Sequence, residues 1–415
     1  MKWLFLFLAT ACFQTLSAQN ITGAWKGAIN IGGNELPIVI HLKQNTSGTI
    51  TGSWDSPAQH VTNLQFSKME ANGNELILEM EQFNAQYKGT FVNADSLNGN
   101  WVQNGQSFPL HLKRSDEQTV FYPNEKELTL KMRDGYKISG TLLAKDKKQP
   151  LVLIIAGSGP TDRNGNNPMA SVDAYRMLAH NLDSQNIATF RFDKRGVAGS
   201  LLTGFKEDDL LFKTYIDDAE DIVTQLYEMG FKNIVIAGHS EGSLIGMVAA
   251  VDKKVQGYIS IAGAGRSIDK ILSEQLSKGV ADSVKTKLDL IISSLRNGEE
   301  IKDIPAGWQM VFRPSVQPYL ISWMKYNPLV EIKKLNCPVL IIAGTCDIQV
   351  PECDAKLLAD AFPKSKLVII KNMSHTLKNA GDDCKLQQST YSSATMPLDK
   401  ELTEVIATFV KKVAG

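Results

Sequence analysis

Apolar and polar side chains alternate over short runs between residue 21 and about residue 113, and Gly, Asn, Ser and Asp separate the runs. The run from Leu36 to Leu42 is one example. Alternation with a period of two is typical of strands with one buried face, and turn residues between such runs indicate a series of short strands. We therefore expect an all-β domain over residues 19–115, built as a small barrel or sandwich.

A short pattern recurs three times in this segment and ends each time in tryptophan, at Ile21–Trp25, Ile50–Trp54 and Leu97–Trp101. One interpretation is a module that binds carbohydrate or lipid through these rings. The other is a structural domain, because a tryptophan at the same position of successive strands suits packing without any ligand. We favour core packing.

From Lys126 the pattern changes. A hairpin around Asp134-Gly135 is followed by near-continuous apolar runs, which are typical of strands buried on both faces of a parallel sheet. These runs are Leu151–Ala156, Ala188–Phe192, Ile234–Ala237 and Val339–Ala343. Helical stretches, such as 174–184 and 215–229, lie between them. The alternation predicts an α/β domain with a mostly parallel, doubly covered sheet over residues 126–415, joined to the β domain by a polar linker at 116–125.

One long helical stretch interrupts this alternation at about residues 266–335, between the strand Tyr258–Ala262 and the strand at Val339. It is rich in large apolar side chains, including Trp308, Tyr319 and Trp323. We expect a helical cap over the carboxyl edge of the sheet. Extra helices with aromatic side chains in the core are the alternative.

The first residues predict a secretory signal peptide over 1–18, with a basic start, an apolar run at Trp3–Phe13 and small residues before a cleavage after Ala18. The run is too short for an anchor helix, which needs about 20 residues. Cys12 suggests lipoprotein processing as an alternative. Ala9 stands three residues before it, where a leucine is usual, so we favour the signal peptide over lipoprotein processing. The mature protein is expected to be periplasmic or extracellular.

Charge and composition exclude other classes. The chain has 44 Lys and Arg against 44 Asp and Glu, so no net field indicates nucleic acid or an anionic membrane as a partner. No further segment is apolar enough for a membrane span. Neither a Cys-x-x-Cys nor a His-x-x-x-His spacing occurs, so we expect no metal, and no sequence feature implies an organic cofactor. The sequence does not indicate whether the protein is a monomer or an oligomer.

The strongest chemical signal is Gly238-His-Ser-Glu-Gly242, between the apolar run at 234–237 and a helical stretch. A strand, a sharp turn and a helix place a serine at the apex, where its hydroxyl is exposed to a base and to a substrate. The flanking glycines allow close packing of the turn, and the helix N-terminus favours developing negative charge. Ser240 is therefore a candidate nucleophile.

With this motif in its parallel-sheet context, the chain from Lys126 onward resembles the α/β-hydrolases, and specifically secreted bacterial esterases whose relatives are also described as serine-aminopeptidase-like. In that family the order along the chain is serine, acid, histidine. Only His375 lies downstream of Ser240, after an apolar run at 367–370. Asp347 ends the strand that follows the cap and matches the family's acid. Asp354 is the second choice, but it lies at the start of a helix and is expected to be a solvated carboxylate that interacts with the helix dipole.

The resemblance also implies an oxyanion hole. Its donors would be the backbone amides of Glu241 and Ser158, with Gly159 as second choice. The Glu241 side chain could contact a substrate amine, but we favour a surface carboxylate in the first helical turn. Asp193 and Arg195 are expected to form a structural ion-pair and turn network under the site.

Four cysteines follow the signal peptide. Cys337 precedes an apolar run and is expected to be a buried free thiol. The family fold would bring Cys346, Cys353 and Cys384 near one another, so one pair among them could link the active-site loops. The pairing itself stays open.

The resemblance implies hydrolysis of carboxylic esters, on small-molecule substrates with short acyl groups, through an acyl-enzyme at Ser240. Two alternatives remain open. One is a serine exopeptidase, either aminopeptidase or prolyl-oligopeptidase-like, and the other is a catalytically inactive binding protein that works through its β domain.

Overall fold

The computed structural model describes residues 21–44, 49–56, 61–115, 124–167, 170–202, 204–252, 255–277, 279 and 281–414. The predicted signal peptide, including Cys12, and nearly all of the predicted linker lie outside these residues. The chain divides into two compact units on either side of residue 120. Among the described residues, no helix combines the length and apolar character needed to cross a bilayer.

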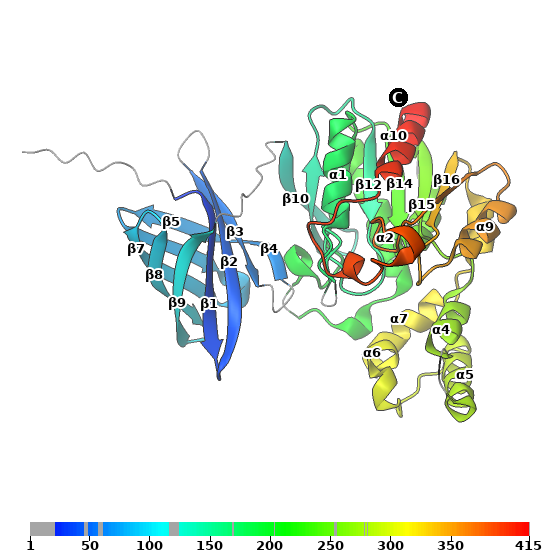
Figure 1. The fold of residues 1–415 in the computed structure, drawn as a ribbon, viewed down its shortest axis with the longest axis horizontal. Helices are drawn as coiled ribbons and strands as arrows, with labels where there is room; N and C mark the ends of the chain where they lie inside the picture. Colours follow the sequence, from blue (N-terminus) through cyan, green and yellow to red (C-terminus); the bar gives the residue numbers. More distant parts are fainter. Residues whose placement is uncertain are drawn as a thin grey trace, which may run out of the picture. The chain divides into compact units, whose positions relative to one another are not determined.

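The first unit is a nine-stranded antiparallel sheet in the order β4-β3-β2-β1-β9-β8-β7-β6-β5 (Figure 1). Its strands are β1 (Gly23–Ile31), β2 (Asn34–Gln44), β3 (Ile50–Ser56), β4 (Val61–Gln65), β5 (Lys68–Asn72), β6 (Glu75–Met80), β7 (Ala85–Asn93), β8 (Ser96–Gln103) and β9 (Gln106–Ser115). The two edge strands β4 and β5 are separated only by Phe66 and Ser67, so the sheet must curl until its edges approach each other. The amide of Phe66 donates to the carbonyl of Gly52 on β3, which brings this turn against the sheet.

The three repeated tryptophans lie in the core of this unit. Trp25, Trp54 and Trp101 are 0%, 4% and 1% exposed, and the rings of Trp54 and Trp101 meet edge to face with centroids 5.0 Å apart. Rings enclosed in this way cannot stack on a ligand from solvent, so core packing is confirmed for all three.

The second unit is built on an eight-stranded sheet in the order β10-β11-β13-β12-β14-β15-β16-β17. Its strands are β10 (Glu125–Lys131), β11 (Lys137–Leu143), β12 (Leu151–Ile155), β13 (Ala188–Phe192), β14 (Ile234–His239), β15 (Gly257–Ile261), β16 (Val339–Gly344) and β17 (Lys366–Ile370). β11 pairs antiparallel with both of its neighbours, and every pair from β13 to β17 is parallel. This is the strand order of an α/β-hydrolase, and the predicted fold class is confirmed.

Helices cover both faces of this sheet, and successive side chains of its strands pack into the cores on opposite faces. Leu153 packs on one face with α2 (Phe212–Glu228) and α3 (Glu241–Asp252), whereas Val152 and Ile154 pack on the other with α1 (Ala174–Ser184) and α10 (Lys400–Ala414). The remaining helix of the sheet layers is α9 (Glu352–Ala361). Burial on both faces explains why these strands are continuous apolar runs.

The segment between β15 and β16 forms the predicted helical insertion. Its helices are α4 (Ile268–Ser277), α5 (Asp282–Arg296), α6 (Gln309–Phe312), α7 (Gln317–Trp323) and α8 (Pro328–Glu331). Figure 1 shows α4 to α7 together at one end of the sheet. Leu288, Phe312 and Leu320 belong to a small core within the insertion. Gln275 on α4 donates to the carbonyl of Gln349 at 3.0 Å, and Gln349 follows β16, so the insertion lies at the carboxyl ends of the strands.

Candidate active site

Ser240 occupies a strained turn between β14 and α3. Its φ is +56°, in the left-handed region that side chains other than glycine disfavour. Two hydrogen bonds hold the turn, from the amide of Ser240 to the carbonyl of Ile261 and from the amide of Ser243 to the carbonyl of Ser240. Strain of this kind persists only where the surroundings enforce it, and it is common at functional sites.

The glycines on either side of Ser240 are required by close backbone contacts. A Cβ on Gly238 would lie 2.1 Å from the carbonyl oxygen of Gly242. A Cβ on Gly242 would lie 2.4 Å and 2.5 Å from the carbonyl oxygens of Ile155 and Ala156. The turn is therefore pressed against the end of the central strand β12, and the motif's glycines are explained by space.

Three side chains form a continuous chain of hydrogen bonds that ends at the serine. His375 Nε2 is 3.1 Å from Ser240 Oγ, and His375 Nδ1 is 2.7 Å from Asp347 Oδ2. Asp347 Oδ1 accepts the amides of Gln349 and Val350, both at 2.8 Å. Since the Asp347 carboxylate can only accept, Nδ1–H of His375 donates to it, and Nε2 is left as the acceptor that faces the Ser240 hydroxyl. The structure thus brings together Ser240 and the two residues, Asp347 and His375, that the family resemblance implied.

The second-choice acid, Asp354, lies elsewhere. It is fully buried in the first turn of α9 and binds Arg266 at 2.7 Å, together with the backbone amides of Gly265 and Arg266. The expectation of a solvated carboxylate there was wrong, because Asp354 fixes the segment that leads into α4.

His239 connects the serine turn to two other loops. Its Nε2 is 2.8 Å from the carbonyl oxygen of His375, and its Nδ1 is 2.8 Å from Tyr175 Oη, which in turn accepts the amide of Gly157. The carbonyl can only accept, so Nε2 carries the proton and Nδ1 accepts from the tyrosine. Burial, followed by the nearby charge of His375, lowers the pKa of His239 to about 3. A neutral imidazole is what this pair of contacts requires.

The loop after β12 lies directly against the nucleophile. A Cβ on Gly157 would lie 3.1 Å from Ser240 Cβ. The amide of Gly157 is used by Tyr175, whereas among the described residues no hydrogen bond engages the amide of Ser158 or of Glu241. Gly159 has a φ of +76°, which turns the chain away after Ser158. The predicted oxyanion donors are therefore on the two segments that flank Ser240.

Glu241 lies in the first turn of α3, as expected, but it is not the surface carboxylate that we had favoured. It is 5% exposed, and its Oε1 is 2.8 Å from the ammonium of Lys194, which is itself buried. The same ammonium donates to the carbonyl of Gly157 at 3.1 Å and lies 4.3 Å above the ring of Tyr215. Lys194 follows strand β13 in the sequence Asp-Lys-Arg, and the signal that could have revealed it is a lysine two positions after a fully buried strand.

Asp193 and Arg195 do belong to ion pairs under the site, but with other partners than expected. Asp193 binds Arg163 in the polar loop after β12, at 2.7 Å, and Arg195 binds Asp218 on α2, at 2.5 Å. Each pair anchors a different element.

The insertion contributes an aromatic side chain to this region. Tyr319 on α7 is buried, and burial, followed by the negative charge of Glu241, raises the pKa of its hydroxyl well above the usual value. Its ring packs against Tyr215 and Trp323 with centroids 5.7 Å and 5.8 Å away. Trp323 in turn stacks on Phe212 of α2 at 5.3 Å. Aromatic contacts thus join the insertion to the helix that flanks the serine turn.

The cysteines resolve into one pair and two free thiols. Cys346 and Cys384 form a disulfide that links the loop carrying Asp347 to the loop that follows His375. Cys353 is exposed, and Cys337 is only partly buried rather than fully enclosed as expected, because it precedes β16 instead of lying within it. Within the described residues, no cluster of three His, Cys, Asp or Glu side chains could hold a metal ion.

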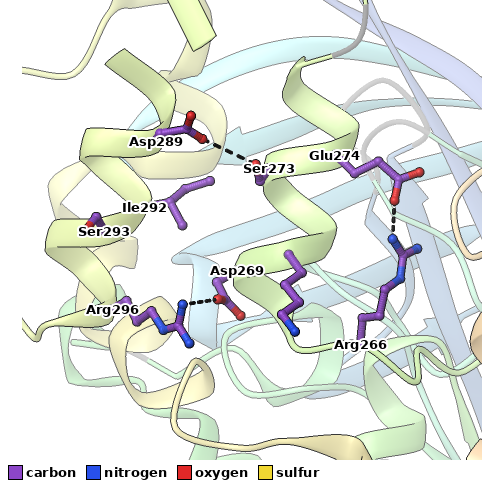
Figure 2. A pocket seen from close by; sticks show the side chains of 9 residues that line it. Arg266, Asp269, Ser273, Glu274, Asp289, Ile292, Ser293 and Arg296 are labelled. Carbon is purple, nitrogen blue, oxygen red and sulfur yellow. Dashed lines mark hydrogen bonds and ion pairs between the residues drawn. The ribbon is translucent and has the colours of Figure 1, made fainter. Parts of the chain in front are cut away.

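Two surface pockets border the insertion. The larger, of about 430 Å³, lies between α4 and α5, where Arg266 pairs with Glu274 and Arg296 pairs with Asp269 (Figure 2). None of Ser240, Asp347 and His375 lines it. A smaller pocket of about 220 Å³ is lined by Asp347 and by Ile271 of α4, so it adjoins the acid of the site.

Comparison with known proteins agrees with this architecture. The family model described as "Serine aminopeptidase, S33" matches residues 169–381, just over half of the chain. The esterase EstD of Thermotoga maritima is 26% identical over an alignment of 240 residues that covers 55% of this chain and 54% of that protein, so the chain spans about half the length of this curated relative.

Solved structures match the chain at lower identity. Est1E from Butyrivibrio proteoclasticus, solved with ferulic acid, is 20% identical, with 69% of this chain and 96% of that chain covered and a TM-score of 0.46. DcsB, solved with a substrate analogue, is 17% identical, with 70% and 99% covered and a TM-score of 0.48. The chain belongs to the serine aminopeptidase S33 family of α/β-hydrolases.

Proposed function

We propose that this protein is a serine hydrolase of carboxylic esters that works through an acyl-enzyme intermediate at Ser240. The observation that carries the proposal is the hydrogen-bond chain Asp347–His375–Ser240, which ends on a strained and glycine-flanked turn. The partial similarity to the esterase EstD supports the same reaction class. The substrates would be small esters with short acyl groups.

In the first half of the reaction, His375 Nε2 takes the proton of the Ser240 hydroxyl as Oγ attacks the acyl carbonyl carbon. Asp347 holds the ring in the required tautomer and stabilises the imidazolium that forms. The carbonyl oxygen gains negative charge, which the amides of Ser158 and Glu241 would bind. When the tetrahedral adduct collapses, the bond to the alkoxide breaks and His375 returns the proton to the leaving alcohol.

In the second half, water replaces the alcohol. His375 takes a proton from water as its oxygen attacks the acyl carbon, and a second tetrahedral adduct forms in the same oxyanion site. Collapse of this adduct breaks the bond to Ser240 Oγ, which regains its proton from His375. The products are a carboxylic acid and an alcohol, and the enzyme returns to its starting state.

The ion pair of Glu241 supports an esterase rather than an aminopeptidase. An aminopeptidase needs a group that binds the free amine of its substrate, and Glu241 is the acidic side chain next to the nucleophile. Its carboxylate is already neutralised by Lys194 at 2.8 Å and is buried. Using it to bind an amine would require breaking that pair, which strands a buried cation and costs several kcal/mol.

The test is to compare p-nitrophenyl acetate and butyrate with aminoacyl p-nitroanilides, and to label the protein with a fluorophosphonate. We expect ester turnover and labelling in the wild type, and neither in Ser240→Ala. His375→Ala should fail to label, because the hydroxyl loses its base. Turnover of anilides alone would replace the esterase assignment by an exopeptidase, and an unlabelled wild-type protein would favour a binding function.

We also propose that the protein acts outside the cytoplasm. The disulfide between Cys346 and Cys384 supports this, because such bonds persist in oxidising compartments and are rare in the cytosol. Cell fractionation checks it, and recovery of the active protein from the cytosol would contradict it.

A further inference from the structure

We propose that Lys194 is a positioning residue that orients both backbone donors of the oxyanion hole. The inference rests on the proposed serine-hydrolase mechanism and adds a residue that the triad does not include. Lys194 stands apart from other buried cations of the site because its ammonium contacts both segments that flank Ser240.

The first contact is with the loop after β12. Lys194 Nζ donates to the carbonyl oxygen of Gly157 at 3.1 Å. This carbonyl and the N–H of Ser158 belong to the same planar peptide group and point in opposite directions. A cation that binds the oxygen therefore fixes where the N–H points. It also polarises the group, since hydrogen bonds in a chain strengthen one another.

The second contact is with the first residue of α3. Lys194 Nζ is 2.8 Å from Glu241 Oε1, and the backbone amide of Glu241 is the other proposed donor. Because both partners are buried, the ion pair is little screened by solvent. The ammonium of Lys194 thus links the side chain of Glu241 to the peptide group between Gly157 and Ser158. Its two hydrogen bonds set the spacing between the amides of Glu241 and Ser158.

The surroundings keep the ammonium in this place. Tyr215 presents its ring face 4.3 Å from Lys194 Nζ, which favours a cation at that position. Tyr319 of the insertion packs against the same Tyr215 ring, with centroids 5.7 Å apart. Because the ammonium of Lys194 binds the Gly157 carbonyl and the Glu241 carboxylate, its effect is exerted through the amides of Ser158 and Glu241.

The test compares Lys194→Met with the double variant Lys194→Met/Glu241→Gln. The single change strands a buried carboxylate and can impair folding. The double change removes both charges and still releases the Gly157 carbonyl. The number of competent sites is first counted by fluorophosphonate titration, so that kcat is expressed per active site. Loss of one complete oxyanion donor costs about 10²–10³-fold in kcat, and loosening both should cost roughly tenfold to a hundredfold, with KM little changed.

A purely structural role would not produce that pattern, and two further measurements separate the cases. A trifluoromethyl ketone forms a tetrahedral adduct with Ser240 that carries an oxyanion, so its affinity should fall by the same factor as kcat/KM. The unfluorinated ketone forms no adduct and should bind as in the wild type. The matched control is Arg195→Met/Asp218→Asn, which removes a neighbouring buried ion pair without touching Gly157 and should retain kcat per active site.

The proposal is overturned if the double variant keeps kcat per active site within twofold of the wild type, or if its affinity for the trifluoromethyl ketone is unchanged. Failure of the proposed function looks different. If the wild type cleaves anilides rather than esters, the substrate assignment is lost, yet the ketone comparison still measures the effect of Lys194 on the oxyanion site.

Discussion

Ser240 adopts a backbone conformation that costs a non-glycine residue roughly 1–2 kcal/mol, since its φ is +56°. Glycine adopts the same conformation without that cost. We predict that Ser240→Gly has a larger free energy of unfolding than Ser240→Ala, by about 1 kcal/mol, although both lack the hydroxyl and should be inactive. Urea unfolding of the two variants measures the difference, and equal midpoints would show that the turn is not strained.

His239 gives the fold a specific sensitivity to acid. Its pKa is lowered to about 3 in the folded protein, from an ordinary value near 6.5 in the unfolded chain. The unfolded chain therefore takes up a proton first, so the stability that depends on neutral His239 is complete above pH 6.5 and is lost as the pH falls towards 3.

We predict that His239→Gln, whose amide can still donate to the carbonyl of His375, shows a flatter dependence of unfolding free energy on pH between 6.5 and 3 than the wild type. Chemical unfolding at a series of pH values provides the measurement. Identical slopes for the two proteins would mean that His239 does not titrate differently on folding.

At the scale of single residues, the sequence was sufficient to predict the residues of the triad. It was not sufficient to predict the buried ion pair of Glu241, which depends on packing. Ser240, Asp347 and His375 each follow an apolar run, and parallel strands place such positions at one edge of the sheet. Lys194, the partner of Glu241, lies 47 positions away in sequence, and no local sequence pattern connects the two residues. Burial of that pair depends on how β13 and β14 flank β12, which periodicity does not specify.

At the scale of elements, the disulfide joins two loops that carry functional side chains. Cys346 directly precedes Asp347, and Cys384 ends a short turn nine positions after His375. The bond closes a loop with a sequence separation of 38, for which the chain-entropy model gives roughly 4 kcal/mol of stabilisation.

We predict that Cys346→Ser/Cys384→Ser lowers the free energy of unfolding by about 2–4 kcal/mol, as measured in urea. Cys353→Ser is the control, because this thiol is exposed and unpaired and should leave stability within about 0.5 kcal/mol. A double variant as stable as the wild type would show that the loops are held by their other contacts. The sequence narrowed the pairing to three cysteines but could not select the pair, since that depends on the path of the loop after His375.

At the scale of the whole molecule, the two units differ in what their sequences could specify. Residues of β6 and β7 alternate between buried and partly exposed, as expected for strands with one buried face. The alternation could not predict that β4 approaches β5, because these two strands are the opposite edges of the sheet. In the second unit, buried runs and intervening helices were sufficient to predict the fold. The insertion was predicted as a helical cap over the carboxyl edge, but the course of its individual helices was not.

The place of the insertion has a consequence for how such an enzyme diversifies. β15 and β16 are direct neighbours in the sheet, so the chain leaves and returns at adjacent positions, and the insertion holds its own small core. A gene could therefore lengthen, shorten or exchange this segment while the strands on either side keep their register. Lineages that share the serine turn can then acquire new substrates by recombination at two neighbouring points, with the inherited chemistry left intact.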